Sequence, residues 1–255
     1  MNIYLSINLL YLGGLMGKAF KTFRGSGKSL ILAINDPTFN LQQLTDLLSK
    51  APEELGGVKV GLPYMLRYGV RQLRSVFQEY PSFYYLADLK LADLGEVMAL
   101  SVNELINSGF DGVVAHAFIG VKGALDVLKK TLEDVGMDLF LQVSMPHPGS
   151  EEVIDTTYLR VKNVINGVNA EGAVVPAKKS YLIKDLKNTF PSIVILASGI
   201  LRLGAQPGEG LCYGADSEVV GRAITLATNP SAMAKDVINM QRDYLVKNRN
   251  ICVKG

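Results

Sequence analysis

The chain has 255 residues, of which 48% are apolar and 20% carry a charge. This balance is ordinary for a soluble globular protein, and the length fits a single α/β barrel domain. Lys and Arg exceed Asp and Glu by only two (26 − 24), and no basic run stands out. These features argue against a surface that coats nucleic acid, but they leave room for a local phosphate site.

The two cysteines, Cys212 and Cys252, lie far apart and do not resemble the dense pattern of a disulfide-stabilised secreted domain. A core of this size also needs no such cross-link. We therefore expect no disulfide framework and a location in the reducing cytoplasm.

The N-terminus, residues 1–28, is expected to be an extension of the main domain, which would span residues 29–250. Residues 3–16 are apolar but too few for a comfortable membrane span. No basic region precedes them and no convincing cleavage site follows, so a secretory signal is not expected. Three interpretations stay open: an appended or misassigned start with Met16 as the true beginning, a packed helix, or a membrane anchor.

From residue 30 onward, short apolar runs rich in β-formers alternate with longer segments of helical pattern. Runs that are apolar throughout are typical of parallel strands buried on both faces. Eight such units predict an α/β fold, a single (β/α)8 TIM barrel, with a doubly wound open sheet as the alternative. The predicted strands are residues 30–35, 57–61, 83–90, 111–116, 138–144, 172–176, 192–198 and 217–221.

Active sites of such barrels lie at the C-terminal ends of the strands. Polar side chains that stand at the predicted strand ends are Asp36, Lys59, Asp88, Lys90, Asp93, His116, Ser144, Ser198 and Arg222. Most of the unusual charge thus falls where a barrel enzyme would need it.

The most informative segment is residues 87–96, with the sequence ADLKLADLGE. Asp88 and Lys90 are two apart, so on a strand both side chains point to the same face, about 6–7 Å from each other. Asp36 and Lys59 would supply a second opposed pair on the two preceding strands. One alternative is an ion-pair network that only ties strand ends together. Burial of charge is costly, so the convergence of these four charged residues at the catalytic end of the barrel favours a functional role.

The order of these motifs resembles the orotidine monophosphate decarboxylase suprafamily over residues 29–234. DLKLAD at 88–93 matches the DxKxxD signature of that family. Further matches, in the order of the family, are LAIND at 32–36, VKVG at 58–61, HPG at 147–149, GAQ at 204–206 and VGR at 220–222.

The resemblance implies decarboxylation of orotidine 5'-monophosphate to uridine 5'-monophosphate in pyrimidine biosynthesis, with no cofactor and no metal. Lys90 would donate the proton that replaces CO2, and Asp88 would lie beside the departing carboxylate. Asp36 and Lys59 would extend the array and bind ribose hydroxyls. Asp93 would reach into the site of a neighbouring subunit, which implies a homodimer.

The phosphate end is expected in the loops after the last two strands, as is common in these barrels. By the resemblance, Gly221 and Arg222 would hold the phosphate, and Gln206 would bridge phosphate and pyrimidine from a closing loop, residues 198–210. The alternative is a flexible surface loop followed by an ordinary capped helix.

Three departures from the family pattern bear on the substrate contacts. Pro146 stands where a pyrimidine-binding serine is common, so Ser144 or a backbone group would take that role. Leu94 and Gly95 replace a more usual Ile-Pro, and Val97 replaces an intersubunit threonine. The loop before GAQ also carries extra residues, 201–203.

The pattern D-x-x-x-x-D-x-G, which ends at Gly95, also resembles the sister enzymes of the suprafamily. These are hexulose-phosphate synthase and ketogulonate-phosphate decarboxylase, which use Mg2+. They carry an acidic metal ligand on strand two, where this chain has Lys59, and a lysine repels a metal ion. His116 and His147 have no recognisable ligand spacing. A noncatalytic nucleotide-binding barrel is a further alternative, which would bind nucleotide without turning it over.

Overall fold

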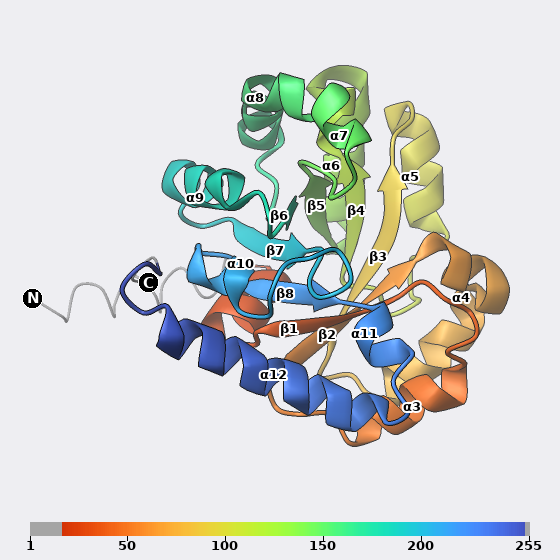
Figure 1. Cartoon of the computed structure of the whole chain (residues 1–255). Coiled ribbons are helices and arrows are strands. Elements are labelled where there is room, and N and C mark those ends of the chain that lie inside the picture. The colour runs from red at the N-terminus through yellow and green to blue at the C-terminus, as the bar shows by residue number, and fades with distance from the viewer. Residues whose placement is uncertain (1–16, 253–255) are drawn as a thin grey trace, which may run out of the picture.

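The computed structural model describes residues 17–252 and contains eight parallel strands in a closed barrel, ordered β1 to β8 as in the chain (Figure 1). Pairing of β1 with β8, for example Leu30 with Glu218, closes the sheet. The predicted (β/α)8 barrel is confirmed, and the open-sheet alternative is wrong. The strands are β1 (Leu30–Ile34), β2 (Leu55–Gly61), β3 (Tyr84–Leu91), β4 (Gly112–His116), β5 (Asp138–Gln142), β6 (Gly172–Pro176), β7 (Val194–Ser198) and β8 (Ser217–Val220).

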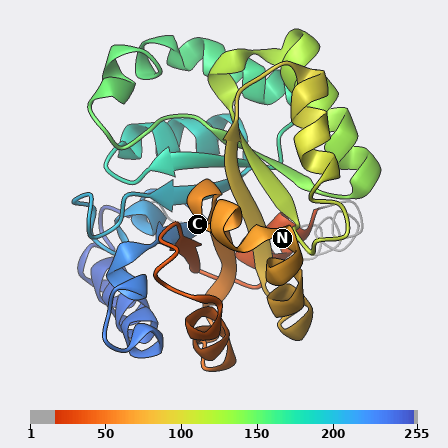
Figure 2. The same ribbon diagram turned by 90° about the vertical axis from the view of Figure 1, so that its right-hand side faces the viewer.

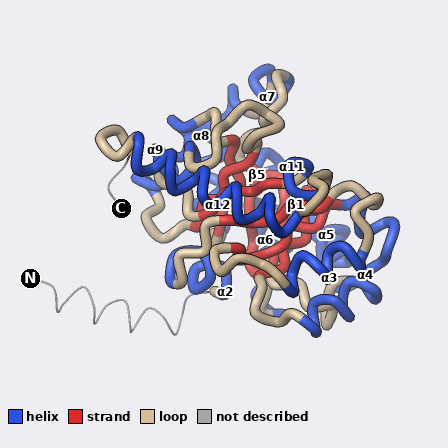
Figure 3. The backbone as a smooth tube through the Cα atoms, turned by 60° about the horizontal axis from the view of Figure 1, so that its bottom comes forward, coloured by secondary structure: helices blue, strands red, loops and turns tan. Residues whose placement is uncertain are grey.

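Helices surround the barrel and cover the outer faces of its strands, as Figures 2 and 3 show. The longer helices are α3 (Leu41–Ser49), α4 (Leu62–Glu79), α5 (Gly95–Asn103), α6 (Asp126–Val135), α8 (Tyr158–Val168), α9 (Ser180–Thr189) and α12 (Pro230–Lys247). Shorter helices are α2 (Lys18–Phe20), α7 (Gly149–Glu152), α10 (Glu209–Cys212) and α11 (Arg222–Thr225). Single 3-10 or π turns are Lys21–Gly25, Ala117–Ile119, Val121–Leu125 and Asp155–Thr157.

Side chains alternate along each strand and so form two separate cores. Ile31 and Ala33 of β1 point into the barrel, where they meet Phe140 and other buried side chains. Leu32 and Ile34 point outward into the larger core beneath the helices. The same alternation decides which polar residue at each strand end faces the mouth of the barrel.

Residues 17–28 pack against the N-terminal end of the barrel, opposite the mouth. The Ala19 amide donates to Asp138 Oδ2 at 2.9 Å, and the Phe23 ring meets Tyr84 edge-on at 5.4 Å. Lys18 pairs with Asp111 at 2.8 Å. This part of the expected extension therefore belongs to the packing of the barrel. Met16 and the rest of the apolar stretch at 3–16 lie outside the described residues.

Within residues 17–252, no helix is long and apolar enough to cross a membrane.

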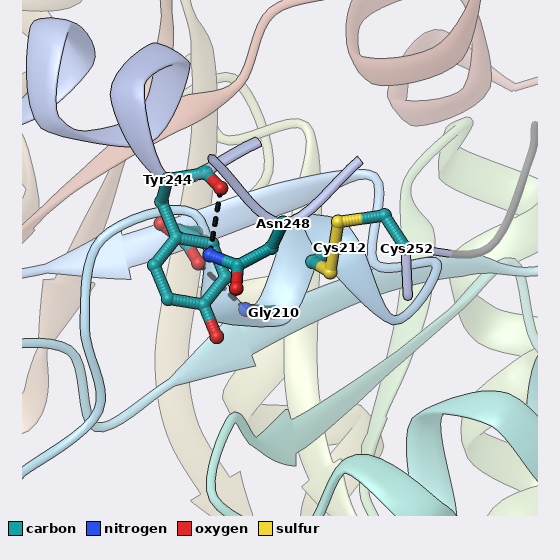
Figure 4. The surroundings of a disulfide bond; sticks show 6 residues. Gly210, Cys212, Tyr244, Asn248 and Cys252 are labelled. Carbon is teal, nitrogen blue, oxygen red and sulfur yellow. Dashed lines mark hydrogen bonds between the residues drawn. A yellow bond between two sulfur atoms is a disulfide. The ribbon is translucent and has the colours of Figure 1, made fainter. Parts of the chain in front are cut away.

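Cys212 of α10 and Cys252, which follows α12, form a disulfide with a Cα–Cα distance of 4.4 Å (Figure 4). The expectation from sequence that these cysteines form no disulfide is therefore wrong. Two cysteines 40 residues apart carry no pairing signal in sequence. Helix α12 packs against α10, and this packing brings the end of the chain to Cys212.

Candidate active site

A cavity opens at the C-terminal ends of the strands, and its charged lining residues are Lys59, Lys90, Arg202 and Arg222. These side chains come from β2, β3, the loop after β7 and the start of α11. The cavity therefore lies where the barrel rule places an active site. No carboxylate belongs to the lining among the described residues, although Asp88 lies directly behind the two lysines.

Asp88 joins the two lysines into one array. The two ends of its carboxylate contact different cations: Oδ2 pairs with Lys59, and Oδ1 accepts from Lys90 Nζ at 2.8 Å. Asp88 and Lys59 are 4% and 7% exposed, so this pair is almost fully removed from water. The Lys90 side chain keeps 35% of its surface exposed and can meet a ligand in the cavity.

Burial and charge oppose each other in this array. Burial lowers the pKa of Lys59 below its usual value, and Lys90 lowers it further, while Asp88 acts in the opposite direction. Burial alone would raise the pKa of Asp88, but the charges of Lys59 and Lys90 outweigh burial and hold that pKa below its ordinary value. Asp88 is thus an anion at neutral pH, placed between two cations.

Lys90 has an unusual backbone conformation, with φ at +47°. The register between β3 and β4 shifts in the same place, between Ala87 and Leu91. A lysine in the left-handed region is strained, and such strain persists only where its surroundings hold it, often at functional sites. The ion pair with Asp88 is one such contact.

The structure places Asn35, and not Asp36, at the cavity. Asp36 accepts hydrogen bonds from the amide and hydroxyl of Thr38, at 2.9 and 2.8 Å, and these lower its pKa. The expectation that Asp36 extends the array is therefore not met. Ile31 and Ala33 share the inward face of β1, and Asn35, one residue beyond the strand, continues this alternation, which would have selected Asn35 from sequence.

Asn35 also lies against the end of β2. A Cβ atom on Gly61 would stand 1.8 Å from Asn35 Oδ1, so any other residue at this position would displace the Asn35 side chain. Gly61 therefore leaves room for the Asn35 side chain beside the end of β2.

Ser144 does not line the cavity. It is fully buried, donates to Asp155 Oδ1 at 2.6 Å and accepts from Lys179 Nζ at 3.1 Å. Lys179 also pairs with Asp155 and donates to Met145 O at 3.1 Å. The hydroxyl predicted to contact the pyrimidine is thus engaged in a buried network.

Met145, Pro146 and Gln142 line the cavity at this point instead. Gln142 is buried at the end of β5, and its Nε2 donates to Ser144 O at 2.6 Å. Sequence reasoning missed Gln142, although it shares the inward face of β5 with Phe140.

Asp93 lies in the turn before α5, where it is exposed and accepts from the Leu94 amide at 2.7 Å. It is not part of the cavity lining of its own chain. The structure therefore does not bring Asp93 together with Lys59, Asp88 and Lys90 inside one chain.

Gly221 and Arg222 line the end of the cavity beside β7 and β8, together with Ser198 and Gly199. Gln206 lies elsewhere: it faces a hollow next to α12, near Tyr244, and its backbone N–H donates to Glu209 Oε2 at 2.9 Å. Arg202, from the extra residues of the loop, lines the cavity in its place. The sequence marks residues 201–203 as extra, but nothing in their pattern indicates that Arg202 faces the cavity.

A closed parallel barrel with a Lys–Asp–Lys array at its mouth and two arginines beyond it is the architecture of a barrel enzyme whose active site lies at the strand ends. A family model described as "Orotidine 5'-phosphate decarboxylase / HUMPS family" matches residues 28–237. The chain belongs to this family.

Two curated relatives are named orotidine 5'-phosphate decarboxylase. The protein from Aeropyrum pernix is 39% identical over 183 residues, which cover 71% of this chain and 75% of that protein. The protein from Saccharolobus solfataricus is 33% identical over 220 residues, 86% of this chain and 95% of its own length. The crystal structure of orotidine 5'-monophosphate decarboxylase from Sulfolobus solfataricus aligns with a TM-score of 0.77 at 32% identity, covering 86% of this chain and 99% of that one. These matches confirm the predicted family and the prediction of a carboxy-lyase enzyme.

Proposed function

We propose that this chain converts orotidine 5'-monophosphate into uridine 5'-monophosphate and CO2, a step of pyrimidine biosynthesis. The observation that carries the proposal is the array of Lys59, Asp88 and Lys90 at the cavity. The names of the relatives supply the substrate, and the chemistry of the array suits it.

Loss of CO2 breaks the bond between C6 and the carboxyl carbon and leaves an electron pair on C6. That pair lies in an orbital poorly placed for delocalisation into the ring, so it needs a nearby positive charge and then a proton. The ammonium of Lys90 supplies both: its charge stabilises the developing anion, and one of its protons moves to C6. Lys90 then regains a proton from solvent.

Asp88 positions Lys90 through the 2.8 Å hydrogen bond and lies beside the carboxylate that departs. Two carboxylates so close would repel each other, and release of CO2 removes the repulsion. The same anion stays paired with the Lys90 ammonium until the carbanion forms. Lys59, on the other side of Asp88, balances the charge of the array.

Asn35 and Lys59 are the groups that we assign to the ribose hydroxyls, with Asn35 in the place expected for Asp36. Gln142 and the carbonyl of Pro146 are assigned to the pyrimidine, in place of Ser144, because the Met145 amide and carbonyl already bond to Ser150 and Lys179. Each assigned side chain or backbone group belongs to a residue that lines the cavity, and each can form a hydrogen bond.

Gly221 and Arg222 are assigned to the phosphate, because the guanidinium suits phosphate oxygens. Gln206 faces away from the cavity in this conformation. Its predicted contact with substrate therefore requires the loop of residues 198–210 to rearrange when substrate binds.

A homodimer is part of the proposal. Large apolar side chains lie exposed just after β2, β3 and β4, and their exposed fractions are 45% for Leu62, 77% for Leu66, 69% for Leu94, 41% for Val97 and 52% for Phe118. Such a patch is typical of an interaction surface. Asp93 is in the same rim, so a second copy docked there would bring its Asp93 toward this cavity.

A cytoplasmic location is also part of the proposal. It rests on the proposed step of pyrimidine biosynthesis and not on the cysteines, because the Cys212–Cys252 disulfide removes the argument from their reduced state.

The test follows the ultraviolet absorbance of orotidine 5'-monophosphate with purified protein, with and without EDTA. We expect conversion to uridine 5'-monophosphate that EDTA does not slow. Turnover that stops in EDTA, or Mg2+-dependent turnover of a hexulose phosphate, would instead support the sister enzymes. Tight binding of uridine 5'-monophosphate without turnover would support the noncatalytic barrel.

A further inference from the structure

We propose that Arg202 is a second phosphate-binding residue, which acts with Arg222 at the same end of the cavity. This inference rests on the proposed function, because it assigns the phosphate of a nucleotide to that end. It begins with the loop between β7 and α10, whose extra residues, 201–203, carry Arg202.

The loop has a defined shape that presents Arg202 to the cavity. The Leu201 amide donates to Ala205 O at 2.7 Å, and the Gly204 amide donates back to Leu201 O at 2.9 Å. Ile200 and Ala205, on either side of this turn, are 4% and 2% exposed and anchor it in the core. Arg202 thus stands at the tip of a turn that is folded on itself.

The backbone angles of the turn support the same conclusion. Leu201 has φ at +60°, in the left-handed region, while Gly199 and Gly204 have φ at +86° and +93°. A leucine is strained in this region, so its surroundings must hold it there. The extra residues therefore form a specific turn whose tip lines the cavity.

The charge of Arg202 is not neutralised by the protein. Among residues 17–252, no carboxylate oxygen lies within 4.0 Å of a guanidinium nitrogen of Arg202 or Arg222. Lys178, the neighbouring cation on the β6 side, pairs with Glu209 at 3.5 Å. Lys59 and Lys90 share the charge of Asp88. Within residues 17–252, the two arginines are thus the cations of the cavity that have no carboxylate partner.

A phosphate monoester is the part of the proposed substrate that matches two free guanidinium groups. It carries up to two negative charges near neutral pH, and guanidinium groups bind its oxygens in a bidentate manner. Gln206, the residue expected to reach the phosphate, faces α12 instead. Arg202 occupies the cavity wall where the loop would supply that contact.

The test measures the binding of uridine 5'-monophosphate and of uridine by calorimetry. The proteins are the wild type, Arg202→Ala, Arg202→Lys, and a matched control, Arg160→Ala, on the outer face of α8. Arg202 is exposed, so its substitution leaves folding intact, and thermal melting verifies this. We expect Arg202→Ala to weaken the binding of uridine 5'-monophosphate at least about tenfold and the binding of uridine less than about twofold. Arg202→Lys should recover part of the loss, and Arg160→Ala should bind as the wild type does.

Equal nucleotide affinity in Arg202→Ala and wild type would overturn the inference, as would an equal loss for uridine, which would place Arg202 at the base. The proposed function fails separately, when the wild type binds uridine 5'-monophosphate but does not convert orotidine 5'-monophosphate. A wild type that does not bind the nucleotide would overturn both.

Discussion

Asp88 Oδ1 lies 2.8 Å from Lys90 Nζ, while the other oxygen of the same carboxylate pairs with Lys59. One buried anion therefore holds two cations, and all three groups stand at the mouth of the barrel. The geometry gives Asp88 two separable roles, one in the stability of the fold and one in the placement of the proton donor.

Replacement of Asp88 by Asn should destabilise the protein, because it leaves Lys59 buried without its counter-charge. Breaking one side of a buried ion pair costs about 3 kcal/mol, part of which is relieved if Lys59 loses its proton. Urea denaturation measures this difference. Asp36→Asn, in the turn after β1, is the matched control and should cost much less, because Asp36 has no charged partner within the described residues. Equal stability of the Asp88→Asn variant and the wild type would show that the array does not bear on folding.

Asn35 and Asp36 should differ in their effect on catalysis, because only Asn35 lines the cavity. We expect Asn35→Ala to lower kcat/KM for orotidine 5'-monophosphate about tenfold, since it removes a hydrogen bond to the substrate. Asp36→Ala should leave kcat/KM within about twofold of the wild type. Steady-state kinetics measures both values. A larger loss of kcat/KM in Asp36→Ala than in Asn35→Ala would mean that Asp36, as the sequence suggested, is the functional residue.

Reduction of the Cys212–Cys252 disulfide should lower stability without lowering activity, since the bond lies outside the cavity. A bond that closes a loop of 40 residues contributes about 4 kcal/mol in the chain-entropy model. Denaturation with and without dithiothreitol measures the effect. Cys252→Ser provides the control, because dithiothreitol should not change its stability. If dithiothreitol lowers the stability of the wild type and of Cys252→Ser equally, reduction of the disulfide is not the cause of the loss.

Subunit complementation tests the proposed role of Asp93. Asp93→Ala and Lys90→Ala should each be nearly inactive alone. If Asp93 acts in the neighbouring cavity, mixing and re-associating the two variants restores one intact site in each mixed dimer, or about a quarter of wild-type activity. A mixture of Arg222→Ala and Lys90→Ala is the control and should stay inactive, because both residues act within their own chain. No rescue in the first mixture would argue against a shared site.

The barrel and the core of the array could be predicted from sequence for clear physical reasons. Parallel strands are buried on both faces, so they leave apolar runs at regular spacing. The two-residue spacing of Asp88 and Lys90 then placed both on the inward side at the mouth. Lys59 followed from its position near the end of β2.

The remaining residues depend on features that local patterns do not contain. Asn35 and Asp36 follow each other just beyond β1, so an error of one residue in the alternation exchanges one for the other. The Ser144 network needs Asp155 and Lys179, which only the tertiary fold brings to it. The position of Arg202 follows from positive φ angles at its neighbours, among them Leu201, a residue that gives no warning of that conformation.

The central claim is that Lys90 is the proton donor of a decarboxylation, and turnover by Lys90→Ala tests it most directly. Orotidine 5'-monophosphate is followed by absorbance with wild type, Lys90→Ala, and Lys130→Ala as an exposed control on α6, after calorimetry has shown that the Lys90 variant still binds uridine 5'-monophosphate. We predict rapid turnover by the wild type and the control, and a loss of at least about a thousandfold in kcat for Lys90→Ala. Turnover by Lys90→Ala at the wild-type rate would contradict the account.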